Sequence, residues 1–414
     1  MSKHARDRRP YIPPVKRIEL SESNTTARWI AIVVLLAVAV TAMAVGLSSA
    51  LTTEPGWRQV EVPPTNTNCS GDFVLVYEFG AGDRKATGEY KNVVNLYTSL
   101  TERGYQLFTA QEGSLGKLNS NPNTVVTVPQ ELYKALELLT RSGIRYPFFA
   151  PAAREYGGVF LADNDADAAL FDPNRDPERM AFVQEAVAYC ADPAHISLEL
   201  LDQNQVKLVI SQEYLAYGRE NEIDVYFDFG WMKNAFLVDF LAEELAQAGY
   251  TRGHLTSFDG FTRNLDSRGG GYSYNLFDRL DNSIFIPARL NYTGPMSIVA
   301  LRNYPLSDAD RWHYHVYGDG AITSVYLDLR GQNTSSTDNL TCYSQTDSCA
   351  EILMQAAPLF LAEELDYVGL GAMEAAGIHS VWAEGHVLIH TQNDADMQLL
   401  PESGDPEYML VALK

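Results

Sequence analysis

Cysteine and positive charge are the two features that this sequence has little of. Its 414 residues include only four cysteines, and 31 Lys+Arg stand against 53 Asp+Glu. So few cysteines exclude a miniprotein held together by disulfides, and 46% hydrophobic residues exclude a disordered chain. The net charge of −22 argues against a nucleic-acid partner, because binding phosphate groups requires Lys and Arg.

Motifs of several common enzyme classes are also missing. The sequence contains no P-loop, no nucleophile elbow and no Cys-x-x-Cys pair, and the last absence argues against a structural zinc site. His313 and His315 would share one face of a strand, where two imidazoles can bind a metal ion. The sequence shows no third ligand near them, so this pair remains a weak candidate.

One long hydrophobic run is present. Residues 29–51 carry no charge, and 23 residues in a helix are long enough to cross the hydrocarbon core of a bilayer. The 28 residues before this run hold seven Lys/Arg and three acids, which predicts a cytoplasmic N-terminus. The rest of the chain then lies outside the membrane, with 24 Lys/Arg, 50 Asp/Glu and a net charge of −26. We therefore expect a single-pass protein of the cell membrane that contacts the lipid bilayer through 29–51.

A cleaved signal peptide is the alternative interpretation of this run, with the small residues 48–50 (SSA) as the cleavage site. We favour an uncleaved anchor, because the apolar core of a signal peptide usually spans only 7–15 residues. Both interpretations export the remainder of the chain. The prolines and threonines of 52–68 are typical of a short stalk.

The four cysteines all fall in the exported part, where disulfides can persist. Cys342 and Cys349 are close enough in sequence to close a small loop, while Cys69 and Cys190 stand far from them. Four cysteines allow three pairings, and the sequence does not choose among them.

Helix-like and strand-like segments are mixed along the exported part without strict alternation, which predicts an α+β fold. The segments read as helices are 89–103, a stripe around 132–139 that begins near Pro129, 177–189, 234–248 and 350–365. The segments read as strands are 73–79, 195–200, 206–210, 283–287, 297–301, 313–317 and 322–327, with 378–383 and 386–390 as a final hairpin. No linker divides the region, so we expect one domain at 69–395 followed by a C-terminal tail at 396–414.

Four segments stand in an order and spacing that a known family shares: 114–119 (SLGKLN), 126–132 (VTVPQEL), 227–239 (FDFGWMKNAFLVD) and 350–356 (AEILMQA). Together they resemble the ApbE-type FAD:protein FMN transferases, and the likeness extends diffusely over about residues 70–391. Members of that family are exported α+β proteins that bind FAD and use Mg²⁺ to split its pyrophosphate. They then attach FMN to a Ser or Thr hydroxyl of a target protein.

The resemblance implies two sets of site residues, which apply only if flavin binds and the family activity is retained. The cofactor set is Asn119, Gly230, Trp231, Asn234, Asp239 and Asp259. The metal set is Glu351 and Gln355.

The departures from the family pattern decide the functional prediction. Trp231 stands where the family has a second glycine, and Asn234 stands where it has a lysine. Glu351 and Gln355 replace an Asp and a Thr that bind the metal in the family. The family's His-x-x-Asp-Pro segment is replaced around 326–328 without a histidine, and we expect the ring of Trp231 to fill the cofactor cleft.

Changes at so many cofactor positions favour the interpretation that the chain has kept the fold and lost the FAD and Mg²⁺ site. We therefore predict a membrane-anchored, extracytoplasmic, non-catalytic binding or scaffold subunit with a protein partner outside the membrane. An active, divergent FMN transferase is the alternative, with Asp228 or Asp259 positioning the flavin. A domain that stores flavin without cleaving it is the third possibility.

Overall fold

The computed structural model describes residues 53–61, 72–81, 85–281, 283–400 and 406–413. They belong to a compact unit that runs from Glu54 to Lys414, apart from Thr53, which precedes it. The predicted cytoplasmic tail (1–28) and the predicted membrane span (29–51) lie outside the described residues. Within the described ranges, no helix has both the length and the apolar character needed to cross a bilayer.

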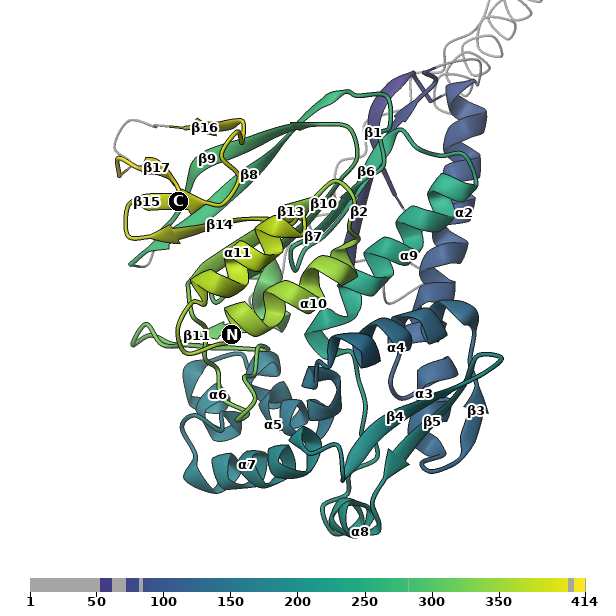
Figure 1. The fold of residues 1–414 in the computed structure, drawn as a ribbon, viewed down its shortest axis with the longest axis vertical. Coiled ribbons are helices and arrows are strands. Elements are labelled where there is room, and N and C mark those ends of the chain that lie inside the picture. Colours follow the sequence, from purple (N-terminus) through teal and green to yellow (C-terminus); the bar gives the residue numbers. More distant parts are fainter. Residues whose placement is uncertain (1–52, 62–71, 82–84, 282, 401–405, 414) are drawn as a thin grey trace, which may run out of the picture. The chain divides into compact units, whose positions relative to one another are not determined.

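The described part combines helices with four sheets, in agreement with the α+β prediction (Figure 1). The α-helices are α2 (Ala86–Phe108), α3 (Gly113–Ser120), α4 (Gln130–Ser142), α5 (Ala150–Leu161), α6 (Asp165–Phe171), α7 (Pro177–Ala191), α8 (Gln212–Glu220), α9 (Lys233–Gln247), α10 (Cys349–Phe360) and α11 (Tyr367–Ala375). Three short 3₁₀ helices are η2 (Tyr146–Phe149), η3 (Gly230–Met232) and η4 (Asp308–Trp312).

The largest sheet has nine strands in the order β1-β2-β6-β7-β10-β13-β14-β15-β17. These strands are β1 (Gly56–Val60), β2 (Phe73–Phe79), β6 (Gly253–Ser257), β7 (Phe261–Asn264), β10 (Met296–Arg302), β13 (Asn339–Ser344), β14 (His379–Glu384), β15 (Val387–His390) and β17 (Met409–Ala412). All neighbours are antiparallel except β15 and β17, which run parallel.

Strand β10 is the centre of this sheet, and all seven of its residues are buried. Because side chains alternate between the two faces of a strand, Val299 and Leu301 point into one hydrophobic core while Met296 and Ile298 point into another. The first core lies under helices α9 and α10, and α11 packs on β14 (Figure 1). The second core is closed by a three-stranded sheet of β8 (Gly271–Leu280), β9 (Ser283–Thr293) and β16 (Met397–Leu399).

Helices α3 to α8 gather with a smaller three-stranded sheet in the lower part of the view in Figure 1, whereas α2 packs beside α9. That sheet consists of β3 (Val125–Thr127), β4 (Ile196–Leu201) and β5 (Gln205–Ile210), in the order β3-β5-β4. A further two-stranded ribbon joins β11 (Tyr314–Val316) to β12 (Ile322–Ser324). The hydrophobic side chains of this half continue into the same core that lies under α9 and α10.

Most of the elements expected from periodicity are present, with displaced ends. The predicted strand 73–79 coincides with β2, and the predicted helix 234–248 is α9 displaced by one residue. The helix predicted at 350–365 ends early, at Phe360, because the chain turns at Leu361. The segment predicted at 313–317 forms a strand over only three residues.

Both ends of the folded unit pair into sheets. Strand β1 falls within the segment expected to be a stalk, and it forms five residue pairs with β2. Strands β16 and β17 fall within the expected C-terminal tail, where they pair with β9 and β15. The folded region therefore extends beyond 69–395 on both sides.

The described cysteines are free and buried, so the loop closed by Cys342 and Cys349 does not form. The Cys342 thiol lies 3.5 Å from the hydroxyl of Ser380, and the Cys349 thiol donates to the carbonyl of Thr262. Burial raises the pKa of Cys342 to about 12, which keeps it as an unreactive thiol. Cys69 lies outside the described residues.

Candidate functional site

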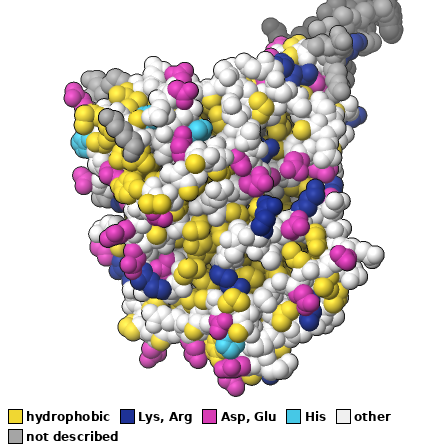
Figure 2. All heavy atoms as spheres, in the orientation of Figure 1, with side chains coloured by type: hydrophobic (Ala, Val, Ile, Leu, Met, Phe, Trp, Pro, Cys, Tyr) yellow, Lys and Arg dark blue, Asp and Glu magenta, His cyan; other side chains and the backbone are white. Residues whose placement is uncertain are grey.

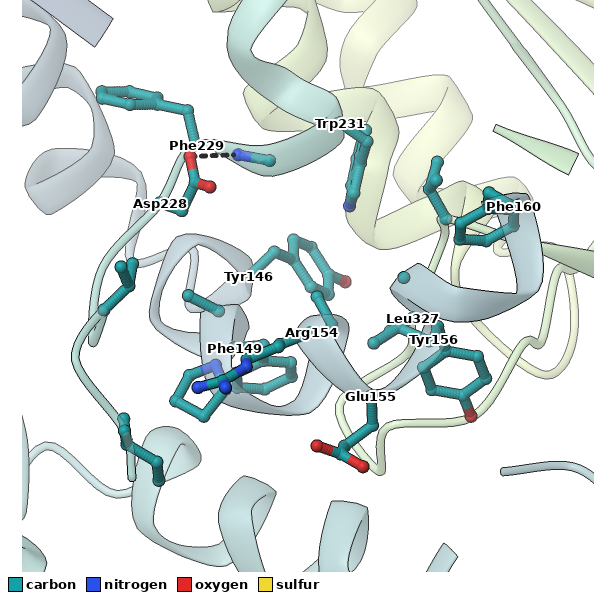
Figure 3. Close-up of a pocket in the computed structure, with 18 of the residues that line it drawn as sticks. Tyr146, Phe149, Arg154, Glu155, Tyr156, Phe160, Asp228, Phe229, Trp231 and Leu327 are labelled. Carbon is teal, nitrogen blue, oxygen red and sulfur yellow. Dashed lines mark hydrogen bonds between the residues drawn. The ribbon is translucent and has the colours of Figure 1, made fainter. Parts of the chain in front are cut away.

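A cavity of about 660 Å³ lies beside the 3₁₀ helix η3 (Figure 3). Its volume is in the usual range for small-molecule sites. Aromatic rings from four separate segments surround it, which favours a planar ligand that stacks on them. The aromatic residues of the lining are Tyr146, Phe149, Tyr156, Phe160, Phe182, Phe229, Trp231, Trp312 and His313.

Asn119 holds the loop that forms one wall of this cavity. Its amide nitrogen donates to the carbonyls of Ala110 (3.0 Å) and Phe227 (2.8 Å). Its amide oxygen accepts from the backbone N–H groups of Tyr226 (3.1 Å) and Phe227 (3.0 Å). These four hydrogen bonds use the full capacity of the side chain, so Asn119 supports the wall rather than facing a ligand.

Gly230 begins η3 with φ of +55°, a left-handed conformation that glycine adopts at little cost. Its N–H donates to Oδ1 of Asp228 at 3.1 Å, marked by the dashed line in Figure 3. Burial raises the pKa of Asp228, while this N–H and the charge of Lys233 act in the opposite direction. The turn places an acidic side chain at the rim of the cavity.

Trp231 lines the cavity and does not fill it, which corrects the expectation of a blocked cleft. Its ring lies 5.0 Å from that of Tyr326, edge to face, and 6.0 Å from that of Tyr146. The indole is therefore part of an aromatic wall that leaves the central space open (Figure 3).

Asn234 and Asp259, two residues of the implied cofactor set, lie in contact. Asn234 is in the first turn of α9, and its amide nitrogen donates to Oδ2 of Asp259 at 2.8 Å, in the turn between β6 and β7. Neither residue lines the aromatic cavity. Burial raises the pKa of Asp259, and the charge of His313 and the neighbouring side chains of Ser257 and Asn234 oppose that rise.

Asp239 serves a different purpose from the one implied. It is buried on α9, where its carboxylate accepts the backbone N–H groups of Cys349 (3.0 Å) and Ala350 (2.8 Å) at the start of α10. Arg263 donates to the same carboxylate at 3.2 Å. Burial raises the pKa of Asp239 to about 6, although Arg263 and the two N–H groups lower it.

Glu351 and Gln355, the implied metal ligands, do not reach the aromatic cavity. Glu351 accepts from the N–H of Ser348 at 3.0 Å, while the Ser348 hydroxyl accepts from the N–H of Glu351, a capping box at the start of α10. Glu351 lines a second cavity of about 440 Å³ together with Asp239, and that cavity shares no lining residue with the first. Gln355 is exposed one turn further along and lines neither cavity.

His313 and His315 do not face a common site. His313 lines the aromatic cavity, whereas His315 pairs with Asp165 at 3.2 Å and packs against Tyr317. Across the described residues, no group of three or more His, Cys, Asp or Glu side chains is placed to hold a metal ion.

Solved structures resemble this arrangement over most of the chain. The ApbE protein of Thermotoga maritima has a TM-score of 0.55 at 12% identity, and the match covers 80% of this chain and 94% of that one. The flavin transferase ApbE of Vibrio cholerae has a TM-score of 0.52 at 14% identity, covering 84% and 97%. No protein-family model and no curated protein matches the sequence.

The chain has the ApbE fold.

Within this ApbE-like fold, the segment that resembles the family's flavin loop forms η3 and the start of α9, and the segment that resembles the metal helix forms α10. The expected residues therefore divide into three groups. Gly230 and Trp231 lie at the cavity, Asn234 and Asp259 form a separate polar pair, and Asp239 lies with Glu351 at the start of α10.

Sequence reasoning missed the aromatic residues of η2 that complete the aromatic cavity. Tyr146 and Phe149 come from a segment more than 80 residues before Trp231. The only local signal was the cluster Tyr146-Pro147-Phe148-Phe149, which is equally typical of a hydrophobic core.

Proposed function

We propose that this chain is a membrane-anchored, extracytoplasmic protein of the ApbE fold that binds a partner or ligand and does not transfer FMN. The proposal rests on one observation: Glu351 and Gln355, the two residues at the family's metal position, do not line the aromatic cavity. The carboxylate of Glu351 closes the capping box of α10, and Gln355 faces solvent. A metal that joins a flavin pyrophosphate to the cavity would need oxygen ligands directed toward it.

The anchor is proposed from the apolar run 29–51 and the basic residues before it. The protein partner outside the membrane is proposed from the surface. Figure 2 shows hydrophobic side chains gathered near the middle of one face, with charged side chains mostly around them. Exposed apolar surface with a polar rim is typical of protein-binding sites.

The test uses the full-length chain in a mild detergent, incubated with FAD in the presence and absence of Mg²⁺. A transferase or pyrophosphatase must release AMP when FAD is split, whatever accepts the FMN, so chromatography of AMP measures the chemistry without a known acceptor. We expect no AMP above the level of a protein-free control. Metal-dependent release of AMP that is lost in Glu351→Ala would overturn the proposal.

An active, divergent FAD:protein FMN transferase is the second candidate, and the open cavity beside Trp231 favours it. The cavity offers aromatic rings for an isoalloxazine, and its polar lining residues include Arg154, Asp228 and His313. Titration calorimetry with FAD separates the possibilities. Binding without AMP release supports a protein that stores or presents flavin, and absence of binding supports a scaffold.

A further inference from the structure

Two buried oxygen atoms on neighbouring side chains have no hydrogen-bond partners in the described part of the chain. They are Oδ1 of Asn234 and Oδ1 of Asp259, on two side chains already joined by one hydrogen bond of 2.8 Å. Asn234 is only 6% exposed. A buried acceptor without a donor is costly, and such atoms in native proteins usually bind a water molecule or an ion.

A second carboxylate belongs to the same cluster. Asp72 precedes β2, and its carbonyl oxygen accepts the N–H of Phe258 at 3.1 Å, which holds it beside the turn that carries Asp259. Burial is the main cause of the raised pKa of Asp72. The charge of Lys233 lowers this pKa, and the nearby negative charge of Asp259 raises it further. The backbone of Asp72 therefore lies against the turn of Asp259, whose side chain is bonded to Asn234 in the first turn of α9.

We propose that Asp72, Asn234 and Asp259 form a binding site for a hard divalent cation. The two unpartnered oxygens and the carboxylate of Asp72 supply three oxygen ligands. Water molecules complete the shell, as is common for Mg²⁺, which is often bound through only one or two carboxylates. A bare water molecule would satisfy the two buried acceptors, whereas a divalent cation would also offset the negative charges of the two carboxylates.

This site differs from the position where the family resemblance places a metal. Glu351 and Gln355 are on α10, and Glu351 lines a cavity that contains neither Asn234 nor Asp259. Among the described residues, no three His, Cys, Asp or Glu side chains can hold a metal ion. The proposed site is consistent with this finding, because one of its three ligands is the amide oxygen of Asn234. Asn234 follows η3 in the sequence, and Trp231 of η3 lines the aromatic cavity, so the site lies close in the chain to the wall of that cavity.

The test is calorimetric titration of the chelator-treated full-length chain in detergent with MgCl₂ and, separately, with CaCl₂. No flavin is present. We expect at least one of the two ions to bind with a Kd of about 1 mM or lower, as in extracellular cation sites. Asp259→Asn keeps the shape of the side chain and removes its charge, and we expect at least about tenfold weaker binding in this variant.

Glu351→Gln is the matched control, because it removes a carboxylate at the family's metal position. This variant should bind the cation as the unchanged chain does. Thermal unfolding without cation checks that each variant is folded, and Asp72→Asn gives the same test if Asp259→Asn does not fold. Absence of binding up to about 10 mM of either ion would overturn the site. Equal binding by Asp259→Asn, or loss of binding in Glu351→Gln alone, would also overturn it. The AMP assay is independent of these results, so failure of the cation site and failure of the proposed function remain distinguishable.

Discussion

Asp239 of α9 accepts the backbone N–H of Ala350 at 2.8 Å, 111 residues away in the sequence, and thereby holds the start of α10. The same carboxylate accepts the N–H of Cys349 and pairs with Arg263. An acid at a helix N-terminus satisfies N–H groups that have no partner within the helix. This contact joins the two helices that cover the central strands, and it explains why Asp239 is not available to a cofactor.

Removing this carboxylate should destabilise the fold strongly. Asp239→Ala leaves two N–H groups and the Arg263 guanidinium without their acceptor in a buried site. We expect a loss of about 2–4 kcal/mol in the free energy of unfolding at pH 7, measured by urea titration. Glu243→Ala, an exposed acid on the same helix, is the control and should change it by less than about 0.5 kcal/mol. Equal losses in both variants would contradict the assigned role.

The raised pKa of Asp239 predicts a pH dependence of stability. Its carboxyl has a pKa of about 6 in the folded chain and an ordinary value of 3.8, so between these values the folded state binds a proton that the unfolded state has lost. Stability from this group is complete below pH 3.8 and decreases as the pH rises through about 6. Urea midpoints at pH 4, 5, 6 and 7 should show this decrease in the unchanged chain relative to Asp239→Asn. Parallel profiles for the two proteins would refute the assignment.

The loop that forms the cavity wall should depend on Asn119. Asn119→Ala leaves two backbone N–H groups and two carbonyls unpaired, so we expect a loss of about 3–5 kcal/mol in the free energy of unfolding. If the variant folds, amide hydrogen exchange at Tyr226 and Phe227 should become faster than elsewhere. Asn121→Ala is the control, because Asn121 follows the same helix and is exposed. Unchanged exchange at the loop would show that other contacts hold it.

Trp231 should contribute to stability through its aromatic neighbours. Trp231→Ala removes the contacts with Tyr146 and Tyr326, and we expect a loss of about 1–2 kcal/mol because the ring is only partly buried. Trp312→Ala is the comparison, since Trp312 lines the same cavity but is 52% exposed and should have a smaller effect. Thermal unfolding measures both, and a Trp231→Ala variant as stable as the unchanged chain would show that the ring serves the cavity alone.

The described cysteines should resist modification in the folded chain. Cys190, Cys342 and Cys349 are buried, and burial raises the pKa of the first two to about 12. Iodoacetamide should label their peptides only after denaturation, as judged by mass spectrometry. A non-reducing digest should contain no peptide that joins Cys342 to Cys349. Detection of that peptide would contradict the arrangement described.

Local patterns predicted which segments form elements more reliably than where those elements end. Strand 73–79 has large hydrophobic residues at alternate positions, and helix 177–189 begins at Pro177, directly after its N-cap Asp176. Residues adjacent in the sequence therefore determine both elements. The end of α10 at Phe360 depends on the packing of the turn that follows, which periodicity does not record. The paired ends of the unit were missed for a similar reason, because β1 and β17 are short strands that become ordered by pairing with β2 and β15.

The candidate site was predicted only in part. The resemblance names Asn234 and Asp259 in the cofactor set, and the structure adds the hydrogen bond that joins them. Motifs identify residue types at a spacing but do not show what each side chain contacts. Asp239, Glu351 and Asn119 form hydrogen bonds within the protein, contacts that the implied cofactor and metal sets did not include.

The sequence by itself determined the α+β class, most of the helices and strands, the acidic charge and the likeness to the ApbE family, because these follow from local periodicity, composition and motif order. Tertiary structure alone decided where the side chains point. It turned Asp239 toward the start of α10, brought Tyr146 to Trp231, and left two oxygens of Asn234 and Asp259 without partners. Such contacts join residues far apart in the chain, so they depend on the packing of whole elements and leave no local signal.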